Sequence, residues 1–547
     1  MKAHEAIVRA LRDAAHTIGV STLPEFKYET PRDPAHGDGA TNLALVIAQA
    51  LGKPPRAVAE QLVGALQLPA GIVKKVEIAG PGFINFFLAE EQLAAVLPAV
   101  LAAGERYGQS DVGRGQRVNV EFVSANPTGP LHVGHGRGAA LGDAIASLLD
   151  WTGHAVTREC YVNDAGTQID RLARSLWARV QQAAGRRAEI PEGGYHGEYL
   201  LEVAERILAR EGRAFADLSE PEGLRRCRVI GVQSLRAEQE EDLREFGVRF
   251  DVIFLESRLY QEKLIEQTLA DLAKRQYTYE QDGALWLKST AFGDDKDRVL
   301  RKSDGTYTYL MPDIAYHRHK RERGFERAID IWGADHHGYV ARVQAAMHAL
   351  GYPADFFRAE LVQLVRVMRG GEEMRFSKRT GEFVSLRDLV QETGVDAARY
   401  FFLMRRGDSQ FVFDVDLAKS QKDENPVYYV QMAHARMSGI FKVAARDPAS
   451  VTPVAADSSV LTQPEEIDLM KELAAFPGVV ARAAETLEPH RVTGYLEGLA
   501  RIAHAWYHKY RVLGEPEERE RLVLAAAVRQ VLANGLRLLG ITAPERM

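Results

Sequence analysis

The stretch that decides the fold runs from residue 118 to residue 137 and reads VNVEFVSANPTGPLHVGHGR. It begins with a short apolar strand pattern at 118–123, passes through a turn that contains proline and glycine, and enters an Ala/Leu-rich helical pattern that extends to about Asp150. A second strand pattern follows at 156–162. Strand, helix and strand in this order predict a β-α-β unit, and therefore a doubly wound, Rossmann-like α/β sheet that binds a nucleotide.

Two histidines open the predicted helix in the motif His132-Val133-Gly134-His135. Activation of an acid by ATP builds negative charge on the α-phosphate and on the departing pyrophosphate, and two imidazoles on the first helical turn can donate hydrogen bonds to it. The helix N-terminus adds its dipole, and Gly134 lets adenine or phosphate approach the backbone. An H-x-G-H sequence also arises by chance, so the motif gains its weight from its place between strand and helix.

A second candidate motif is the basic stretch 375–381, RFSKRTG, which lies about 240 residues after the histidine motif. A loop that carries cations can close over a triphosphate and stabilise the transition state, which makes Ser377 and Lys378 candidate ATP-binding residues. The alternative is a solvated basic loop. The stretch lies in the second half of the same sheet pattern, and the two motifs together are far more specific than either one alone.

The whole chain divides into regions of different pattern, which together predict a multidomain protein. The predicted units are a small α+β unit at 1–110, the doubly wound α/β unit at 111–420 with a mostly helical, charged insertion at about 183–290, and an all-α unit at 421–547.

Shorter patterns place further elements within these units. We expect a loop at 28–40, a helix at 42–51, two strands within 76–88 around a Pro-Gly turn, and strands at 248–254, 284–288, 328–332 and 361–367. Pro489 marks a break between two C-terminal helices, and apolar residues recur at helical spacing over 522–539.

Composition excludes several classes of protein. Hydrophobic residues make up 46% and charged residues 26% of the 547 residues, as is usual in soluble globular proteins. The N-terminus lacks the apolar core of a signal peptide, and no apolar stretch is long enough to span a bilayer, so we expect a cytoplasmic protein without a membrane partner. The two cysteines, Cys160 and Cys227, support neither a disulfide framework nor a structural zinc site. A net charge of −6 argues mildly against a bulk nucleic-acid binder but allows local basic patches.

The two motifs resemble the HIGH and KMSKS signatures of class I aminoacyl-tRNA synthetases, and the surrounding sequence narrows the family. The stretches that resemble arginyl-tRNA synthetases are 120–137, 161–169 (YVNDAGTQI), 425–437 (NPVYYVQMAHARM) and 527–547, while 37–45 and 76–88 resemble the extra N-terminal domain of that family. The resemblance implies a class I catalytic domain between an N-terminal tRNA-contacting domain and a helical anticodon-binding domain.

The resemblance also implies the reaction. Arginine is activated with ATP, accompanied by Mg²⁺, to arginyl-adenylate, and the arginyl group passes to the 3′-terminal adenosine of tRNA(Arg), releasing AMP and diphosphate. The family typically needs tRNA for the first step. In this chain Arg375 and Phe376 replace the first Lys and the Met of the loop signature, while Lys378 keeps the second cation. Many arginyl enzymes lack that lysine and carry one just before the H-x-G-H motif, where this chain has Gly129.

Three residues are candidates for binding arginine, because a guanidinium needs planar, rigidly held carboxylates. Glu121 lies inside an apolar strand pattern, so it is either at the end of a sheet or beside a cationic partner. Tyr309 and Asp313 lie four residues apart, where we expect a helix to begin at Pro312. Taken alone, Asp313 is a first-turn acid; in the family, matching Glu, Tyr and Asp residues bind the substrate guanidinium.

Other candidate residues follow neighbouring strands. Ser124 and Asn126 follow Glu121, and Asn126 matches a family position that binds the α-amino end of the amino acid, although a loop Asn is usually only a turn residue. Asp335, His336 and His337 follow an apolar strand, where open α/β sheets bind ligands. Asp335 contacts either the ATP ribose or the ammonium group of arginine, and His337 is a further ATP-binding candidate. The adjacent histidines lack an apparent third metal ligand, so we expect no zinc.

Candidate tRNA-binding residues lie in the helical C-terminal unit: Tyr428, Gln431, His434 and Arg436. Aromatic and basic groups suit the stacking of unpaired anticodon bases, but core packing is the alternative for Tyr428 and Tyr429, and for Trp506 and Tyr507. The basic run 318–323 (RHKRER) either contacts tRNA phosphates or is a solvated helix face. No feature of the sequence requires a dimer, and we expect a monomer.

Two other functions have to be weighed. A small-molecule nucleotidyltransferase with the same H-x-G-H site is disfavoured by the long helical C-terminal unit. A non-catalytic, synthetase-like RNA-binding protein is disfavoured because the candidate catalytic residues His132, His135 and Lys378 are all present. The lack of a cysteine-rich zinc site disfavours cysteine as the substrate, and an acid-lined site favours a cationic amino acid.

Overall fold

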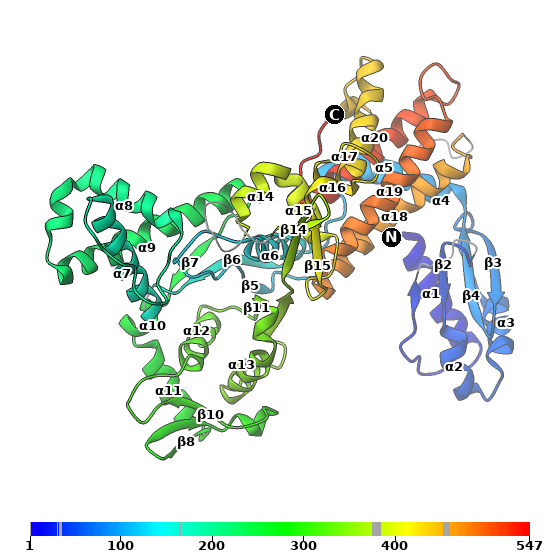
Figure 1. Ribbon diagram of the computed structural model, residues 1–547. Coiled ribbons are helices and arrows are strands. Elements are labelled where there is room, and N and C mark those ends of the chain that lie inside the picture. The colour runs from blue at the N-terminus through cyan, green and yellow to red at the C-terminus, as the bar shows by residue number, and fades with distance from the viewer. Residues whose placement is uncertain (1, 30, 32–35, 165, 375–383, 452–459) are drawn as a thin grey trace.

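The computed structural model describes residues 2–29, 31, 36–164, 166–374, 384–451 and 460–547 (Figure 1). The candidate loop residues Arg375, Phe376, Ser377 and Lys378 lie outside these described residues. Among the described helices, none is both long enough and apolar enough to cross a membrane.

A five-stranded parallel sheet forms the centre of the molecule, with strands in the order β12-β11-β5-β6-β7. Its strands are β5 (Arg117–Glu121), β6 (Ala155–Val162), β7 (Val252–Leu255), β11 (Arg327–Gly333) and β12 (Phe357–Val362). The chain winds outward from β5 to β7 and then returns to the other side of β5 with β11, so the direction of winding changes between β5 and β11. Ligands bind at the carboxyl ends of strands at such a point, and the predicted doubly wound sheet is confirmed.

Helices connect these strands and carry the candidate residues. The helix α6 (Val133–Trp151) joins β5 to β6, while α12 (Leu310–Glu322) and α13 (His337–Ala349) precede and follow β11. The helix α12 begins at Leu310, two residues before the predicted start, and Pro312 lies in its first turn, where its missing N–H costs nothing.

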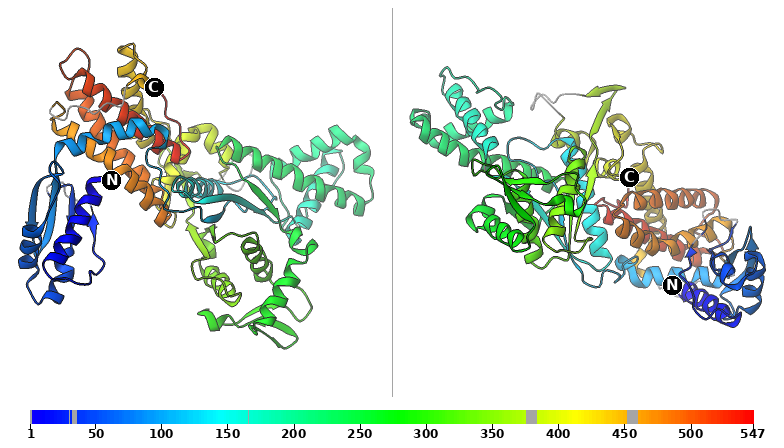
Figure 2. Two further views of the ribbon diagram at one scale, coloured as in Figure 1. Left: turned by 180° about the vertical axis from the view of Figure 1, so that it is seen from behind. Right: turned by 90° about the horizontal axis from the view of Figure 1, so that it is seen from below.

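The predicted insertion at about 183–290 contains the strand β7 of the central sheet, which divides it into two parts. Before β7, the helices α7 (Thr167–Ala183), α8 (Glu198–Glu211) and α9 (Glu220–Glu245) form an arm that projects from the sheet (Figures 1 and 2). After β7 come α10 (Ser257–Gln261), α11 (Leu264–Lys274) and a separate antiparallel sheet of β8 (Thr278–Gln281), β9 (Ala284–Leu287) and β10 (Arg298–Arg301). The edge strand β7 is only four residues long, and its pairing with β6 is not visible in the local sequence.

The N-terminal part is an antiparallel sheet in the order β1-β2-β4-β3, packed against three helices through one apolar core. Its elements are α1 (Lys2–Thr17), β1 (Tyr28–Glu29), β2 (Gly39–Thr41), α2 (Leu43–Leu51), α3 (Pro55–Ala65), β3 (Val73–Ala79) and β4 (Phe83–Leu88). The helix predicted at 42–51 and the two strands within 76–88 are confirmed. The predicted loop at 28–40 instead contains β1 and the start of β2, which pair with each other.

The C-terminal part is helical, as predicted, and consists of α17 (Pro426–Val443), α18 (Pro464–Thr486), α19 (His490–Lys509) and α20 (Glu518–Leu538). The break between α18 and α19 lies at Pro489. Two short helices, α4 (Glu90–Ala94) and α5 (Val96–Ala103), pack against this bundle rather than on the N-terminal sheet. The Asn534 side chain donates to the carbonyl oxygens of Gly104 (3.0 Å) and Tyr107 (3.1 Å), so the end of the predicted first unit, 1–110, contacts the C-terminal bundle.

Between the sheet and this bundle lie β13 (Val365–Arg369), β14 (Glu372–Met374), α14 (Leu386–Thr393), α15 (Val395–Leu403), β15 (Phe411–Asp414) and α16 (Val415–Lys419). The single strand predicted at 361–367 is two strands, because the chain turns between Val362 and Val365. The turn is held from outside: the buried guanidinium of Arg137 on α6 donates to the Gln363 carbonyl at 3.0 Å.

Candidate active site

The two histidines of the H-x-G-H motif cap the first turn of α6. His132 is the N-cap residue; its backbone N–H donates to Nδ1 of His135 at 3.2 Å, and the backbone N–H of His135 donates to Nδ1 of His132 at 3.1 Å. The two rings stack with centroids 3.6 Å apart. Because each Nδ1 accepts a hydrogen bond, each neutral ring carries its proton on Nε2.

Burial favours the neutral form of both rings. It lowers the pKa of His132, and it lowers the pKa of His135 to about 3 with a further contribution from His132. Gly134 makes this arrangement possible, since a Cβ at that position would lie 2.9 Å from Cε1 of His132. The motif therefore offers two Nε2–H donors at the positive end of a helix dipole, which suits an anionic group.

The loop between β5 and α6 is held in a strained conformation. Val123, a β-branched residue, has a φ of 56°, in the left-handed region that such residues rarely adopt. Its carbonyl accepts the Ala125 N–H (2.7 Å) and the Cys160 thiol (3.3 Å). This geometry leaves the candidate side chains of Ser124 and Asn126 exposed at the carboxyl end of β5.

Two residues of the helical arm, which the sequence analysis missed, support the same loop. The buried side-chain amide of Gln239 on α9 donates to the carbonyls of Asn126 (3.1 Å) and Gly129 (2.7 Å). The Tyr199 hydroxyl on α8 donates to the Thr128 carbonyl at 2.8 Å. The arm thus positions a loop more than seventy residues earlier in the chain, a contact that no local pattern predicts.

Tyr309 is the N-cap residue of α12 and Asp313 lies on its first turn, beside a third residue that no local sequence pattern singled out. The hydroxyl of Tyr339, on α13, donates to the Asp313 carboxylate at 2.5 Å, and its ring lies 6.3 Å from that of Tyr309. Tyr309 is 69% exposed. Burial, reinforced by the carboxylates of Glu121 and Glu256, raises the pKa of Asp313 to about 7.

Glu256 was also missed. It follows β7 directly and is half-buried, and its carboxylate accepts a hydrogen bond from Tyr161, while burial raises its pKa. The carboxylates of Glu121 and Glu256 are close enough to Asp313 to raise its pKa, and we call the three residues the acidic cluster. Such a concentration of carboxylates suits a cationic ligand.

Glu121 fits both of the alternatives that the sequence left open. It is at the carboxyl end of β5 with 5% exposure, and it has a cationic partner, since Nζ of the buried Lys320 lies 2.5 Å from its Oε2. The Ser124 hydroxyl donates to its Oε1 at 2.6 Å. Within the described residues, Glu121, His317 and Asp330 have metal-ligand spacing, but the Lys320 ammonium already lies between the two carboxylates.

Asp335 and His337 lie where the strand pattern predicted, at the carboxyl end of β11. A short turn, Ala334–His336, follows Gly333 and leads into α13 at His337, and the side chains of Asp335 and His337 are exposed. The Asp335 carboxylate is 3.5 Å from Nε2 of His336. Both candidates therefore lie beside the point where the winding of the sheet changes direction.

Comparison with known proteins decides the family. The tRNA synthetases class I (R) catalytic domain matches residues 96–436, the arginyl tRNA synthetase N-terminal domain matches 1–88, and the DALR anticodon-binding domain matches 430–547. The chain belongs to the arginyl-tRNA synthetases. It is an arginine–tRNA ligase of class I that uses ATP, as the sequence predicted.

Individual relatives of this arginyl-tRNA synthetase match over nearly the whole chain. It is 50% identical to the arginine–tRNA ligase of Moorella thermoacetica over 99% of this chain and 98% of the relative, and 46% identical to that of Bacillus subtilis over 96% and 95%. Among solved structures, it resembles the putative arginyl-tRNA synthetase of Campylobacter jejuni (TM-score 0.79, 33% identity, 84% of this chain and 100% of that chain). It also resembles the Thermus thermophilus arginyl-tRNA synthetase (TM-score 0.75, 26% identity, 99% and 100%).

In this arginyl-tRNA synthetase the structure corrects the predicted tRNA-binding face of α17. Gln431 and His434 are buried: the Gln431 amide donates to the Asp396 carboxylate (2.7 Å) and the Thr542 carbonyl (2.9 Å), and Nδ1 of His434 lies 2.8 Å from the Pro544 carbonyl. These two side chains fix the C-terminal segment and are not available to anticodon bases.

The other α17 candidates are more accessible. Tyr428, Tyr429 and Arg436 are half-buried, and the Arg436 guanidinium lies over the exposed Tyr507 ring at 5.8 Å. Trp506 is fully buried and belongs to the core, so its role is core packing and not the stacking of anticodon bases.

The basic run 318–323 fits neither of its two predicted roles. Lys320 is fully buried, Arg323 pairs with the buried Glu159 at 2.7 Å, and Arg318 pairs with Asp271 at 3.0 Å. The cations Arg318, Lys320 and Arg323 are therefore paired with carboxylates of the protein itself rather than left free for tRNA phosphates.

Proposed function

We propose that the acidic cluster and the capped histidine pair are the two halves of one active site, which binds arginine and forms arginyl-adenylate. The observation that carries this proposal is the state of Asp313. Its half-buried carboxylate has a raised pKa and accepts from the neutral hydroxyl of Tyr339. A guanidinium would supply the missing positive charge with planar donors that match a carboxylate.

In this proposal Asp313 and Tyr309 hold the guanidinium, with Glu256 as a further carboxylate beside them. Glu121, at the end of β5, is the third residue proposed to hold the guanidinium, and Ser124 and Asn126, in the loop that follows, bind the α-amino end of the amino acid. Asp335 either joins them at the ammonium group or contacts the ATP ribose, and His337 contacts ATP. These roles are supported by the position of all eight residues, just after or at the carboxyl ends of β5, β7 and β11 or at the start of α12.

The chemistry follows from these positions. A carboxylate oxygen of arginine attacks the α-phosphorus of ATP, the bond to the β-phosphate bridge breaks, and pyrophosphate leaves. The Nε2–H groups of His132 and His135 donate to the charge that develops, and Lys378 adds a cation. Mg²⁺ enters with ATP as part of the substrate. In the second step, a hydroxyl of the terminal adenosine of tRNA, the 2′-hydroxyl by class I analogy, attacks the arginyl carbonyl and AMP leaves. We propose no zinc site.

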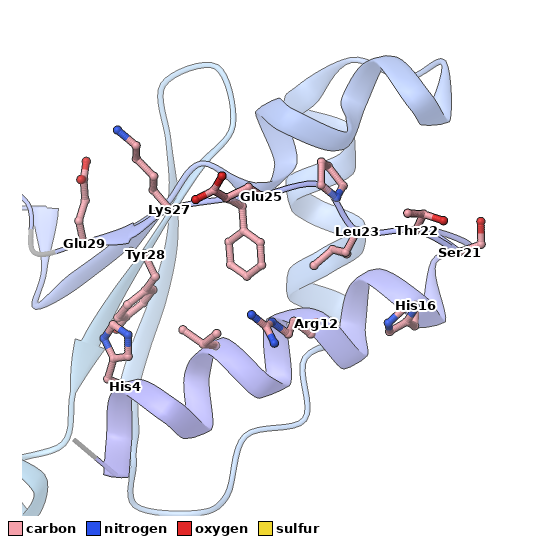
Figure 3. Close-up of a pocket in the computed structure, with 13 residues that line it drawn as sticks. His4, Arg12, His16, Ser21, Thr22, Leu23, Glu25, Lys27, Tyr28 and Glu29 are labelled. Atoms are coloured by element: carbon pink, nitrogen blue, oxygen red, sulfur yellow. The ribbon is translucent and has the colours of Figure 1, made fainter. Parts of the chain in front are cut away.

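The N-terminal part is proposed to contact tRNA through a cavity of about 920 Å³ between α1 and the segment 21–29 (Figure 3). Basic and aromatic side chains share its lining: His4, Arg12, His16, Phe26, Lys27 and Tyr28. Stacking rings beside cations suit an unpaired nucleotide. On α17, Tyr428 and Arg436 remain the candidates for anticodon contact, and the chain is proposed to act as a monomer in the cytoplasm.

The test is ATP–pyrophosphate exchange for all twenty amino acids, with and without tRNA, on the wild type and on Asp313→Asn. We expect exchange with arginine alone, dependent on tRNA, and a raised arginine KM in the variant with an unchanged ATP KM. Tyr260→Phe, near Glu256 but outside the proposed site, is a control for general damage. Asp313→Asn with a wild-type arginine KM would refute the proposed guanidinium site.

A further inference from the structure

Three buried acids form a row across the middle of the parallel sheet. In the register of the strands, Glu121 of β5 lies beside Asp330 of β11 on one side and beside Glu159 of β6 on the other. None of the three is more than 5% exposed. Carboxylates in an interior of low dielectric must be paired with cations or lose their charge.

The helix α12 supplies those cations from one face. Lys320 Nζ lies 2.5 Å from Glu121 and 2.8 Å from Asp330, and Nε2 of His317 lies 2.8 Å from Asp330. Further along the helix, Arg323 donates to both carboxylate oxygens of Glu159, at 2.8 and 2.7 Å. The helix therefore docks on the sheet through matched charges, and Lys320 bridges two neighbouring strands.

Lys320 and Arg323 pair with different carboxylates, Lys320 with Glu121 and Arg323 with Glu159. Glu159 has no part in the proposed arginine site, whereas Glu121 belongs to the acidic cluster. The same helix that holds Lys320 also carries Asp313 on its first turn. The Lys320–Glu121 pair thus fixes the position of β5 relative to the helix end that bears Asp313.

Lys320 also controls the charge of Glu121. Burial and the adjacent Asp330 raise the pKa of Glu121 above its usual range, and Lys320 and His317 oppose this rise without reversing it. The titratable groups around Glu121 come from three elements: Asp330 of β11; Glu159, Cys160 and Tyr161 of β6; and Tyr309, Asp313, Tyr316, His317 and Lys320 at the start of α12 or along it. Two adjacent carboxylates without a cation between them cannot both ionise at neutral pH.

We propose that Lys320 is a positioning residue for arginine: without touching the substrate, it keeps Glu121 ionised and aligned with Asp313. The inference rests on the proposed role of Glu121 in binding arginine. It gives a function to the basic run 318–323, whose central lysine acts on the amino-acid site rather than on tRNA.

The test compares Lys320→Met with the matched control Arg323→Met, which breaks a buried pair on the same helix and strand row. Arginine affinity is measured by calorimetry from pH 6.5 to 9, with ATP affinity and the melting temperature alongside. At pH 7 we expect Lys320→Met to bind arginine more weakly, because Glu121 loses its charge. The affinity should fall about tenfold for each pH unit by which the pKa of Glu121 in the variant lies above the pH of the assay. The loss should shrink as the pH rises, with ATP affinity unchanged. Arg323→Met should lower the melting temperature but keep arginine affinity.

Two further variants separate the outcomes. Glu121→Gln tests the proposed function: if it binds arginine normally, the role of Glu121 fails and the inference with it. If Glu121→Gln loses arginine affinity but Lys320→Met keeps it, only the positioning role is overturned. The same holds if Arg323→Met loses as much arginine affinity as Lys320→Met. The double variant Lys320→Met/Asp330→Asn removes the competing carboxylate, so we expect it to fold and to recover most of the affinity. A double variant as weak as Lys320→Met also overturns the inference.

Discussion

His132 and His135 cap each other: each backbone N–H donates to the Nδ1 of the other ring, at 3.2 and 3.1 Å. The arrangement explains why this motif needs two imidazoles three residues apart on one helical turn. It fixes the tautomer of both rings. Neither ring has to be protonated in order to bind an anion, because each neutral ring already donates a hydrogen bond from Nε2. The pair can therefore bind a developing negative charge without first taking up a proton.

His135→Ala removes one of these donors. We expect arginine activation to slow by about 10²–10³-fold, the usual effect of losing one transition-state donor, with little change in arginine affinity. Tests are pyrophosphate exchange in the presence of tRNA and calorimetric arginine binding. A variant that exchanges at the wild-type rate would contradict the assignment.

Gly134→Ala tests whether the capped geometry itself matters. The new Cβ would lie 2.9 Å from Cε1 of His132 and displace that ring, and a displacement near 1 Å costs about 10²-fold in rate. Gly138→Ala, on the same helix, is the matched control, since its Cβ would meet its nearest neighbour at 3.9 Å. Equal exchange rates in the two variants would show that ring placement is not limiting.

The pH dependence of arginine binding follows from Asp313. Its pKa in the unliganded protein is raised to about 7, and only the ionised form attracts the guanidinium, so below that pH a proton must leave before arginine binds. Arginine affinity should therefore fall by up to about tenfold per pH unit below pH 7 and level off above it. Calorimetry from pH 5.5 to 8.5 measures this, and Asp313→Asn should remove the dependence. A flat wild-type profile is the contrary result.

Gln239→Leu should weaken the loop that carries Asn126. The change removes two hydrogen bonds to loop carbonyls, each of about 1 kcal/mol, so we expect the arginine KM to rise by roughly 5–30-fold with the melting temperature little altered. Gln181→Leu is the control, because its amide donates at 3.0 Å to the Ala216 carbonyl within the arm. If both variants behave alike, the arm does not position the loop.

On α17 the structure separates stability from tRNA contact. We expect His434→Ala to lower the melting temperature, since it frees the C-terminal segment at the Pro544 carbonyl, while Arg436→Ala raises the KM for tRNA and makes it less sensitive to salt. Aminoacylation at two salt concentrations and thermal melting distinguish the two effects. A wild-type tRNA KM for Arg436→Ala would remove it from the interface.

Much of the fold could be predicted because it depends on local patterns. The strand, turn and helix around His132 and the helical spacing near the C-terminus each place their elements within a few residues. Glu121 could be found equally well, because the family motif that contains it is continuous in sequence, while Tyr309 and Asp313 were found by their spacing beside Pro312 at the start of a helix. Their proposed roles came from resemblance, and the structure adds the geometry that supports them.

The sequence by itself determined the family, the doubly wound sheet and the order of the units, since hydrophobic periodicity and motif spacing are properties of neighbouring residues. Only the tertiary structure decided which polar residues meet. Lys320 pairs with Glu121 across 199 positions, Gln239 supports a loop 110 positions away, and Glu256 reaches the acidic cluster only because the four-residue β7 joins the sheet. Gln431 and His434 are likewise buried only because distant segments of the chain pack around them. A charged or polar side chain carries no local sign of its partner, because burial and pairing are fixed only when distant elements pack together.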